Sequence, residues 1–264
     1  MPRESIPARI ALISDLHSNL EALQAVLADI RRRGIDEVWC LGDIVGYGPD
    51  PVACIRAVRD TCRICILGNH DYAALQGPVD FNRLAAGAIR ANTAAVQAAD
   101  RAAPEAGLFG FLRDLPRAYK CGDFLFVHCS PRDPVGEYVY VGGGGGKAMI
   151  EKYQGVFDFV DRYAFCGHTH FPGMIQETER FGLQFLRAEG DEFRLPLPLS
   201  GKTIVNIGSV GQPRDGDSRA CYVELMPDVV VFHRVKYNVL VTAGKIFSNP
   251  DIDDDCGKRL LRAD

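Results

Sequence analysis

The chain has 264 residues, of which 47% are hydrophobic and 24% are charged. This length and composition are typical of one large globular domain with a substantial core, and we expect a single domain over residues 1–264. The formal net charge is -4 and the isoelectric point is about 5.9. Such a balance gives no support for a protein that binds duplex nucleic acid non-specifically, because that function needs a basic face.

The nine cysteines are odd in number and scattered along the chain. Cys62 and Cys65 form a Cys-x-x-Cys pair, which could be a redox pair or half of a zinc site, but no second pair follows. We interpret the cysteines as core thiols of a reduced, cytoplasmic protein. Residues 1–9 lack the apolar segment of a signal peptide, and no stretch approaches the length of a membrane span.

The first 70 residues alternate between predicted strands and helices. Apolar runs predict strands at residues 9–14, 36–41 and 61–67. Helical spacing of apolar residues predicts a helix at 18–33, with Ser18 or Asn19 as its N-cap, and a second helix at 50–60. This alternation is typical of parallel βαβ units.

The pattern changes after residue 72. Residues 72–115 are rich in alanine and predict helices at 81–101 and 105–115. Later segments predict a hairpin around 120–123 and strands at 163–166, 173–176, 183–186, 203–207, 220–225 and 229–235. Residues 238–247 predict a closing helix, and we expect residues 250–264 to pack loosely. Parallel units followed by antiparallel strands predict an α/β fold of two packed sheets with helices outside.

Five consecutive glycines, Gly142 to Gly146, leave the backbone nearly unrestrained. They lie between His128 and His168, so we do not interpret them as a linker between domains. They form either a mobile surface loop or a lid over the site.

Polar side chains follow five of the predicted strands, at the point where each strand ends. Five of the six histidines lie in these segments. In open α/β sheets this is where ligands bind. The oxygen and nitrogen donors there are Asp15, His17, Asp43, Asn69, His128, His168 and His170. Seven donors are too many for one four-coordinate zinc ion, but they suit two adjacent divalent ions bridged by a carboxylate, the clamp that hydrolyses phosphate esters.

These segments resemble the five sequence blocks of the calcineurin-like metallophosphoesterases. The matching blocks are Asp15-x-His17, Gly42-Asp43, Gly68-Asn-His-Asp71, His128 and Gly167-His-x-His170. Residues 42–51, 128–134 and 206–216 further resemble a small prokaryotic phosphodiesterase branch, some members of which cleave dinucleoside polyphosphates. The resemblance spans residues 10–215. It implies a four-layer α/β/β/α sandwich of two mixed sheets flanked by helices, with a helical insertion at about 72–115.

The resemblance also implies how the donors are shared between two ions. One ion would be held by Asp15, His17, Asp43 and His170, and the other by Asp43, Asn69, His128 and His168, so that Asp43 bridges them. Mn²⁺, Fe²⁺ and Zn²⁺ all suit such ligands, and affinity order alone does not choose among them. A metal-bridging hydroxide would attack phosphorus without a covalent enzyme intermediate.

His70 is the histidine of its block that is not a ligand. The resemblance places it beside the phosphate, where with Asp43 it belongs to the catalytic residues and assists the leaving group. The alternative is that Asp71 orients His70 merely to shape the loop.

Five residues are candidate substrate contacts. Arg132 and Arg214 could bind phosphate oxygens with their guanidinium groups, or they could form loop salt bridges with Asp133 and Asp215. Asn69 and Asn19 are further candidates, and Tyr47 could line a pocket for a base or leaving group.

The sequence therefore predicts a metal-dependent hydrolase of phosphoric esters that acts on a small phosphodiester or (di)nucleotide. A serine/threonine protein phosphatase and a catalytically silent metal-binding scaffold are the alternatives. Residues 42–48 lack the second Asp and the Arg that such phosphatases carry after Gly-Asp, and a scaffold should have lost ligands that are all present here. Cys129 stands where the branch usually has Gly, and it adds bulk beside a ligand.

Overall fold

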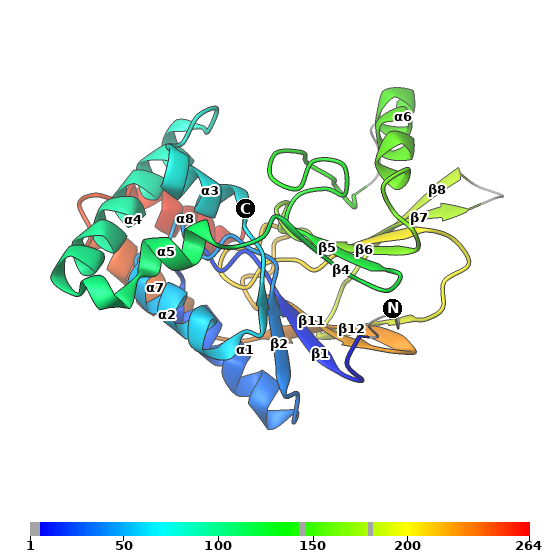
Figure 1. The fold of residues 1–264 in the computed structure, drawn as a ribbon, viewed down its shortest axis with the longest axis horizontal. Helices are drawn as coiled ribbons and strands as arrows, with labels where there is room; N and C mark the ends of the chain where they lie inside the picture. The colour runs from blue at the N-terminus through cyan, green and yellow to red at the C-terminus, as the bar shows by residue number, and fades with distance from the viewer. Residues whose placement is uncertain (1–5, 143–145, 179–181) are drawn as a thin grey trace.

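The computed structural model describes residues 6–142, 146–178 and 182–264. Its centre is a pair of mixed six-stranded sheets (Figure 1). The first sheet has the order β3-β2-β1-β11-β12-β9, with β3 Ile64–Cys65, β2 Glu37–Cys40, β1 Ile10–Ile13, β11 Ala220–Met226, β12 Val229–Val235 and β9 Glu192–Pro196. The second has the order β4-β5-β6-β10-β7-β8, with β4 Ala118–Cys121, β5 Phe124–Val127, β6 Tyr163–Cys166, β10 Thr203–Asn206, β7 Gly173–Thr178 and β8 Gly182–Arg187.

Helices cover the outer faces of both sheets. In Figure 1 most of them gather beside the first sheet, and α6 lies on the far side of the second. The α-helices are α1 Leu20–Arg32, α2 Pro51–Thr61, α3 Asn69–Gln76, α4 Arg83–Ala102, α5 Leu108–Arg113, α6 Gly146–Phe157, α7 Val239–Phe247 and α8 Asp254–Arg262. The predicted α/β/β/α layering is thus confirmed. No helix among the described residues is long and apolar enough to cross a membrane.

The alternating side chains of β1 explain why the sheets pack as layers. Ile10 and Leu12 point to one face, where they join Phe165 in the core between the two sheets. Ala11 and Ile13 point to the other face and join the core under the helices. Because strand side chains alternate between faces, a wholly apolar strand such as β1 must be covered on both sides.

Parallel strands place their carboxyl ends together. β1, β2 and β3 are mutually parallel neighbours in the first sheet. β5, β6 and β10 are parallel neighbours in the second. The loops that leave these strands therefore emerge at one edge of the sandwich.

Several expectations were wrong or incomplete. Residues 250–264 do not pack loosely, because α8 buries Cys256 and Leu260 in a cluster with Ile246 of α7. The third strand has only two residues, and we missed both α6 and β9. Of the glycine run, Gly142 lies in a turn and Gly146 begins α6, whereas residues 143–145 lie outside the described residues. The choice between a mobile loop and a lid therefore stays open, and the single-domain organisation and the insertion at about 72–115 stay predictions.

Candidate metal centre

The predicted donors converge at the shared edge of the two sheets. Asp15 and His17 follow β1, Asp43 follows β2, Asn69 begins α3 after β3, His128 follows β5, and His168 and His170 follow β6. All seven are buried. The sandwich thus brings together side chains that are up to 155 positions apart in the chain, from Asp15 to His170.

Five of these residues have a left-handed backbone. They are Asp15, His17, Asp43, His168 and His170, with φ between 46° and 65°. A residue with a β-carbon adopts this conformation at a cost of about 1–3 kcal/mol, and such strain concentrates at functional sites. The surrounding fold therefore holds these loops in shapes that the chain alone would avoid.

Asp15, His17 and His170 form a first set of donors. Nε2 of His17 lies 3.0 Å from Nε2 of His170. Oδ1 of Asp15 lies 3.1 Å from Nε2 of His170 and 3.8 Å from Nε2 of His17. The ligand atoms of these residues fall within 4.8 Å of one another, close enough to hold a metal ion.

Asn69, His128 and His168 lie beside this set. Nε2 of His128 is 3.0 Å from Oδ1 of Asn69. The ring of His168 lies with its centroid 5.3 Å from that of His128, and its buried Nε2 has no hydrogen-bond partner among the described residues. An orphaned buried nitrogen of this kind points to a missing partner such as a cation.

Asp43 faces both sets. Its Oδ2 lies 3.2 Å from Nε2 of His128 and 3.7 Å from Nε2 of His17. Its Oδ1 accepts the backbone N–H of His70 at 2.8 Å. The carboxylate is thereby fixed with one oxygen directed between the two sets.

Backbone carbonyls orient the imidazoles. Nδ1 of His17 bonds to the carbonyl of Val45 at 3.1 Å, and Nδ1 of His170 bonds to that of Gln212. Each Nδ1 must donate, so each Nε2 carries a lone pair. Two lone pairs that face each other at 3.0 Å repel unless a cation lies between them. This donor arrangement fits a divalent ion.

The electrostatics agree with that fit. Burial lowers the pKa of His17 well below its usual value and also lowers that of His170, so both rings are neutral and free to ligate. Burial opposes the charged form of His128 as well, but Asp43 and Asp15 raise its pKa to about 9. This imidazole holds a proton unless a cation replaces it. Burial likewise opposes ionisation of Asp43, yet His128 and His70 hold the pKa of its carboxyl below the usual range.

Two glycines of the sequence blocks allow their loops to pack closely against the carboxylates of proposed ligands. A β-carbon on Gly68 would overlap the backbone nitrogen and the carboxylate of Asp43. One on Gly167 would overlap the carboxylate of Asp15 and the side chain of Ser14. Glycine at these positions lets the loops pack directly against the ligands.

His70 borders the same centre. Its ring lies 4.7 Å from that of His17 and meets Phe81 edge to face at 5.1 Å. Burial lowers its pKa to about 4, so the ring is neutral near pH 7. Asp71 does not bond to this ring; its carboxylate accepts the backbone N–H groups of Ile44, Val45 and Gly68. The alternative in which Asp71 orients the His70 ring is therefore wrong.

Arg214 and Tyr47 lie next to the donors. The guanidinium of Arg214 lies over the Tyr47 ring at 5.6 Å and donates to Oε1 of Gln212 at 2.8 Å. The buried Nε of Arg214 has no partner among the described residues. Asp215 pairs with Arg234 instead, so the predicted Arg214–Asp215 salt bridge is wrong.

Arg132 and Asn19 are directed elsewhere. Arg132 pairs with Glu137, which corrects the expected pair with Asp133. Asn19 is the N-cap of α1. Its Oδ1 accepts from the Ala22 N–H and the Thr242 hydroxyl, and its Nδ2 donates to the Gly211 carbonyl and the Tyr237 hydroxyl. The Asn19 side chain is thus engaged within the fold, which argues against its role as a substrate contact.

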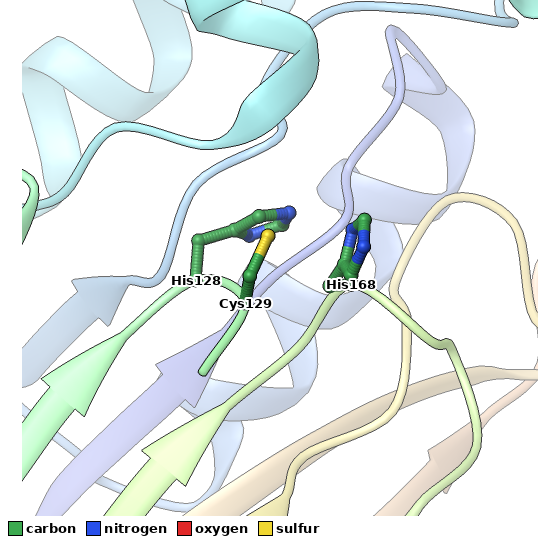
Figure 2. A group of neighbouring side chains, drawn as sticks. All are labelled: His128, Cys129 and His168. Carbon is green, nitrogen blue, oxygen red and sulfur yellow. The ribbon is translucent and has the colours of Figure 1, made fainter. Parts of the chain in front are cut away.

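Cys129 contributes a sulfur atom that we did not predict as a ligand. Figure 2 shows Cys129 beside His128, with its sulfur and the two histidine rings on the same side of the strand ends. The sulfur and one ring nitrogen each from His128 and His168 lie within 4.8 Å of one another. Its position directly after the predicted ligand His128 was the feature of the sequence that could have indicated it.

Asn92 was also missed. This buried residue of α4 accepts from the Ser18 hydroxyl at 2.6 Å and the Gly46 backbone at 2.7 Å, and it donates to the Gly48 carbonyl at 3.0 Å. It thereby ties together the loops that carry His17 and Tyr47. A lone amide on the buried face of an alanine-rich helix was the signal that could have revealed it.

Comparisons with known proteins agree on one family. The model of the calcineurin-like phosphoesterase superfamily domain matches residues 9–227. The chain is 36% identical to a metallophosphoesterase from Sphaerobacter thermophilus, with a TM-score of 0.79, over 97% of this chain and 100% of that one. It is 34% identical to an uncharacterized protein of Methanocaldococcus jannaschii, over 97% of this chain and 98% of the relative.

A shorter match involves a different named activity. The chain is 45% identical over 58 residues to a symmetrical bis(5'-nucleosyl)-tetraphosphatase of Chromohalobacter salexigens. That match covers 21% of this chain and 20% of the relative.

Proposed function

This chain belongs to the calcineurin-like phosphoesterase superfamily and is a hydrolase of phosphoric esters; from that premise we propose that it cleaves a small phosphodiester or nucleotide at a centre of two divalent ions. The family depends on divalent metals. The observation that carries the proposal is the position of Asp43, whose Oδ2 faces Nε2 of both His17 and His128. A carboxylate so placed can bridge two cations.

We divide the proposed ligands between the two ions as the family resemblance implies. Asp15, His17, Asp43 and His170 would hold one ion, and Asp43, Asn69, His128 and His168 the other. Mn²⁺, Fe²⁺ and Zn²⁺ are the candidate ions, since imidazole and carboxylate ligands suit each of them. When bound, two such ions would activate a water molecule and offset the charge that develops on the phosphoryl oxygens.

His70 is the proposed catalytic residue of the chain itself. One of its ring nitrogens lies within 4.8 Å of ligand atoms of His17 and Asp43, although the family resemblance assigns His70 to neither ligand set. An arriving phosphate anion raises the pKa of a neighbouring imidazole, so His70 can take up a proton and pass it to the leaving oxygen. Arg214, with its unpartnered buried Nε, is proposed to hold a phosphoryl oxygen.

The similarity to a tetraphosphatase supports a small nucleotide substrate, but it covers only a short part of the chain. The tetraphosphatase match spans about a fifth of each chain, and it suggests dinucleoside polyphosphates as one substrate class to test. We expect no membrane partner, and we expect no duplex nucleic acid partner because the net charge is -4. Cytoplasmic location stays a prediction.

The test is hydrolysis by chelator-stripped protein before and after addition of Mn²⁺. The panel contains a diaryl phosphodiester, a dinucleoside polyphosphate, a phosphomonoester and a phosphopeptide. Metal-restored cleavage of the diester or dinucleotide supports the proposal. Cleavage of the phosphopeptide alone favours a protein phosphatase, and no cleavage by protein with measured bound metal favours a silent scaffold.

A further inference from the structure

A pocket opens directly from the metal centre. It has a volume of about 630 Å³, which is within the range of small-ligand sites. Asn69, His70 and His168 line it at the metal centre, and residues 72–85 and 133–138 supply most of its walls. A substituent of a phosphate held by the centre would enter this space.

The walls of the pocket are aromatic. Tyr47, Tyr72, Phe81 and Tyr138 all line it. The Tyr138 ring lies 3.9 Å from that of His168, centroid to centroid, and stacks on Tyr140 at 5.7 Å. Tyr72 and Tyr138 are 37% and 42% exposed. Aromatic side chains that stay partly exposed in a pocket are suited to contact with a flat ligand.

The charge in the pocket is negative. Among the described residues that line it, the charged side chains are Asp80 and Asp133, and neither Lys nor Arg is present. Arg117 stacks on Tyr72 at 5.3 Å but does not line the pocket. Arg132 is paired with Glu137. Arg214 lies over the Tyr47 ring and does not line the pocket, so it stays our proposed contact for the phosphate at the metals.

A polyphosphate fits this distribution poorly. The two proposed ions and Arg214 can neutralise one phosphoryl group at the centre. Each further phosphate would carry its negative charge toward Asp80 and Asp133, and no Lys or Arg among the described lining residues offsets it. Phosphate and carboxylate charges repel each other. Proteins that bind several phosphates instead supply several Lys or Arg side chains.

We propose that the pocket receives a flat aromatic substituent without negative charge, and that the substrate is a phosphodiester with a single phosphorus atom. This inference rests on the proposed function and narrows it. In the reaction, the oxygen of water forms a bond to phosphorus and the ester P–O bond to one substituent breaks. The departing oxygen takes up a proton, so the products are a phosphomonoester and an alcohol or phenol.

The decisive comparison uses two ligands that differ only in their phosphates. A 5′,5′-linked dinucleoside monophosphate and the corresponding 5′,5′-linked tetraphosphate present the same nucleosides. With Mn²⁺-loaded full-length protein, we expect kcat/KM for the monophosphate to exceed that for the tetraphosphate at least about tenfold. Equal values, or a preference for the tetraphosphate, would overturn the inference.

Substitutions of aromatic residues that line the pocket test whether the pocket causes the preference for the monophosphate. Tyr72→Ala and Tyr138→Ala should each lower kcat/KM for the dinucleoside monophosphate about tenfold, as expected for loss of one base–aromatic stack. Both side chains are exposed, so both variants should fold. Phe159→Ala removes an aromatic side chain that is 53% exposed and does not line the pocket, and it is the matched control. Unchanged kinetics in both tyrosine variants would contradict the stacking role.

A charge variant tests the repulsion separately. Asp80→Lys should shift the ratio of kcat/KM values toward the tetraphosphate by about three- to tenfold. Asp158→Lys makes the same charge change at an exposed position outside the pocket and should leave the ratio unchanged. If both variants shift the ratio equally, the effect reflects the net charge of the protein, and the pocket does not discriminate between the monophosphate and the tetraphosphate.

The pocket inference can be tested even if the protein does not hydrolyse any of these esters. If no ester is cleaved, both ligands can be titrated calorimetrically into the metal-loaded protein without turnover. Tighter binding of the monophosphate, weakened by Tyr138→Ala, would still support the pocket inference. Tighter binding of the tetraphosphate would overturn it.

Discussion

The carboxylate of Asp43 and the backbone N–H of His70 are joined by a 2.8 Å hydrogen bond that links the loop after β2 to the start of α3. The bond occupies Oδ1 of Asp43 and leaves Oδ2 directed at His17 and His128. It also holds the backbone of His70 against the centre. One contact therefore orients both residues that we propose as catalytic.

Asp43→Asn tests the bridging role. The amide keeps an oxygen that can accept the His70 N–H, but it loses the negative charge that two cations would share. We expect kcat to fall on the order of 10²-fold or more, with reduced metal content by elemental analysis. Asp36→Asn changes an exposed aspartate just before the same strand and is the matched control. Full activity in Asp43→Asn would exclude the bridging role.

His70→Ala separates catalysis from ligation. Because His70 is not in a proposed ligand set, metal content should be unchanged while kcat falls by about 10²–10⁴ for an ester with a poor leaving group. The loss should be much smaller for a p-nitrophenyl ester, since that leaving group departs without a proton. Steady-state kinetics on the two esters, with elemental analysis, measure this. Loss of metal, or equal losses on both esters, would contradict the assignment.

The sequence predicted the donors because each follows an apolar run, and parallel strands align their ends. It did not predict the contacts that orient them. The carbonyl of Gln212, which fixes His170, lies 42 positions away in the 206–216 segment, whose resemblance did not reveal this contact. Asn92 joins two loops from a helix that seemed merely alanine-rich. Such tertiary contacts depend on how the layers pack, and no spacing rule encodes them.

The helix α8, which we expected to be a loosely packed tail, could have been predicted from its local sequence. Asp253 caps the helix, Asp254 and Asp255 lie in its first turn, and Arg259 and Arg262 lie in its last. Acidic residues at the start and basic residues at the end complement the helix dipole. We interpreted this order of charges as a loosely packed tail, although it is the order that stabilises a helix.

Cys129→Ser tests whether sulfur belongs to the centre. The sulfur and one ring nitrogen each from His128 and His168 lie within 4.8 Å of one another, and contact with a metal ion deprotonates a thiol. If the sulfur is a further ligand of the ion that we assign to Asp43, Asn69, His128 and His168, Co²⁺-loaded protein should show a near-ultraviolet sulfur-to-cobalt charge-transfer band that Cys129→Ser abolishes. Cys62→Ser, at a half-buried thiol outside the grouped ligands, should retain the band. If the wild-type protein lacks the band, Cys129 only fills space.

A buried ion-pair network far from the centre makes stability depend on pH. Asp29 of α1 is 8% exposed and accepts hydrogen bonds from Nε of Arg33 at 2.7 Å and from the hydroxyl of Tyr222 at 2.8 Å. Burial opposes ionisation of Asp29, but these bonds hold its pKa below the usual value. The contact ties α1 to β11 across the layer boundary.

Asp29→Asn should therefore destabilise the protein in a pH-dependent way. A carboxyl whose pKa is lower in the folded state stabilises the fold above its unfolded pKa of about 3.9. We expect the variant to lose about 1–3 kcal/mol of unfolding free energy at pH 7. This difference should begin to shrink as the pH falls below about 5, because the Asp29 carboxyl of the unfolded chain then takes up a proton, and it should shrink further as the folded carboxyl protonates at lower pH. Urea denaturation across this pH range measures it. Asp60→Asn, at an exposed aspartate paired only loosely with Arg59 at 3.7 Å, should show almost no loss. A deficit that stays constant to pH 3 would mean that Asp29 stabilises the fold by its shape and not by its charge.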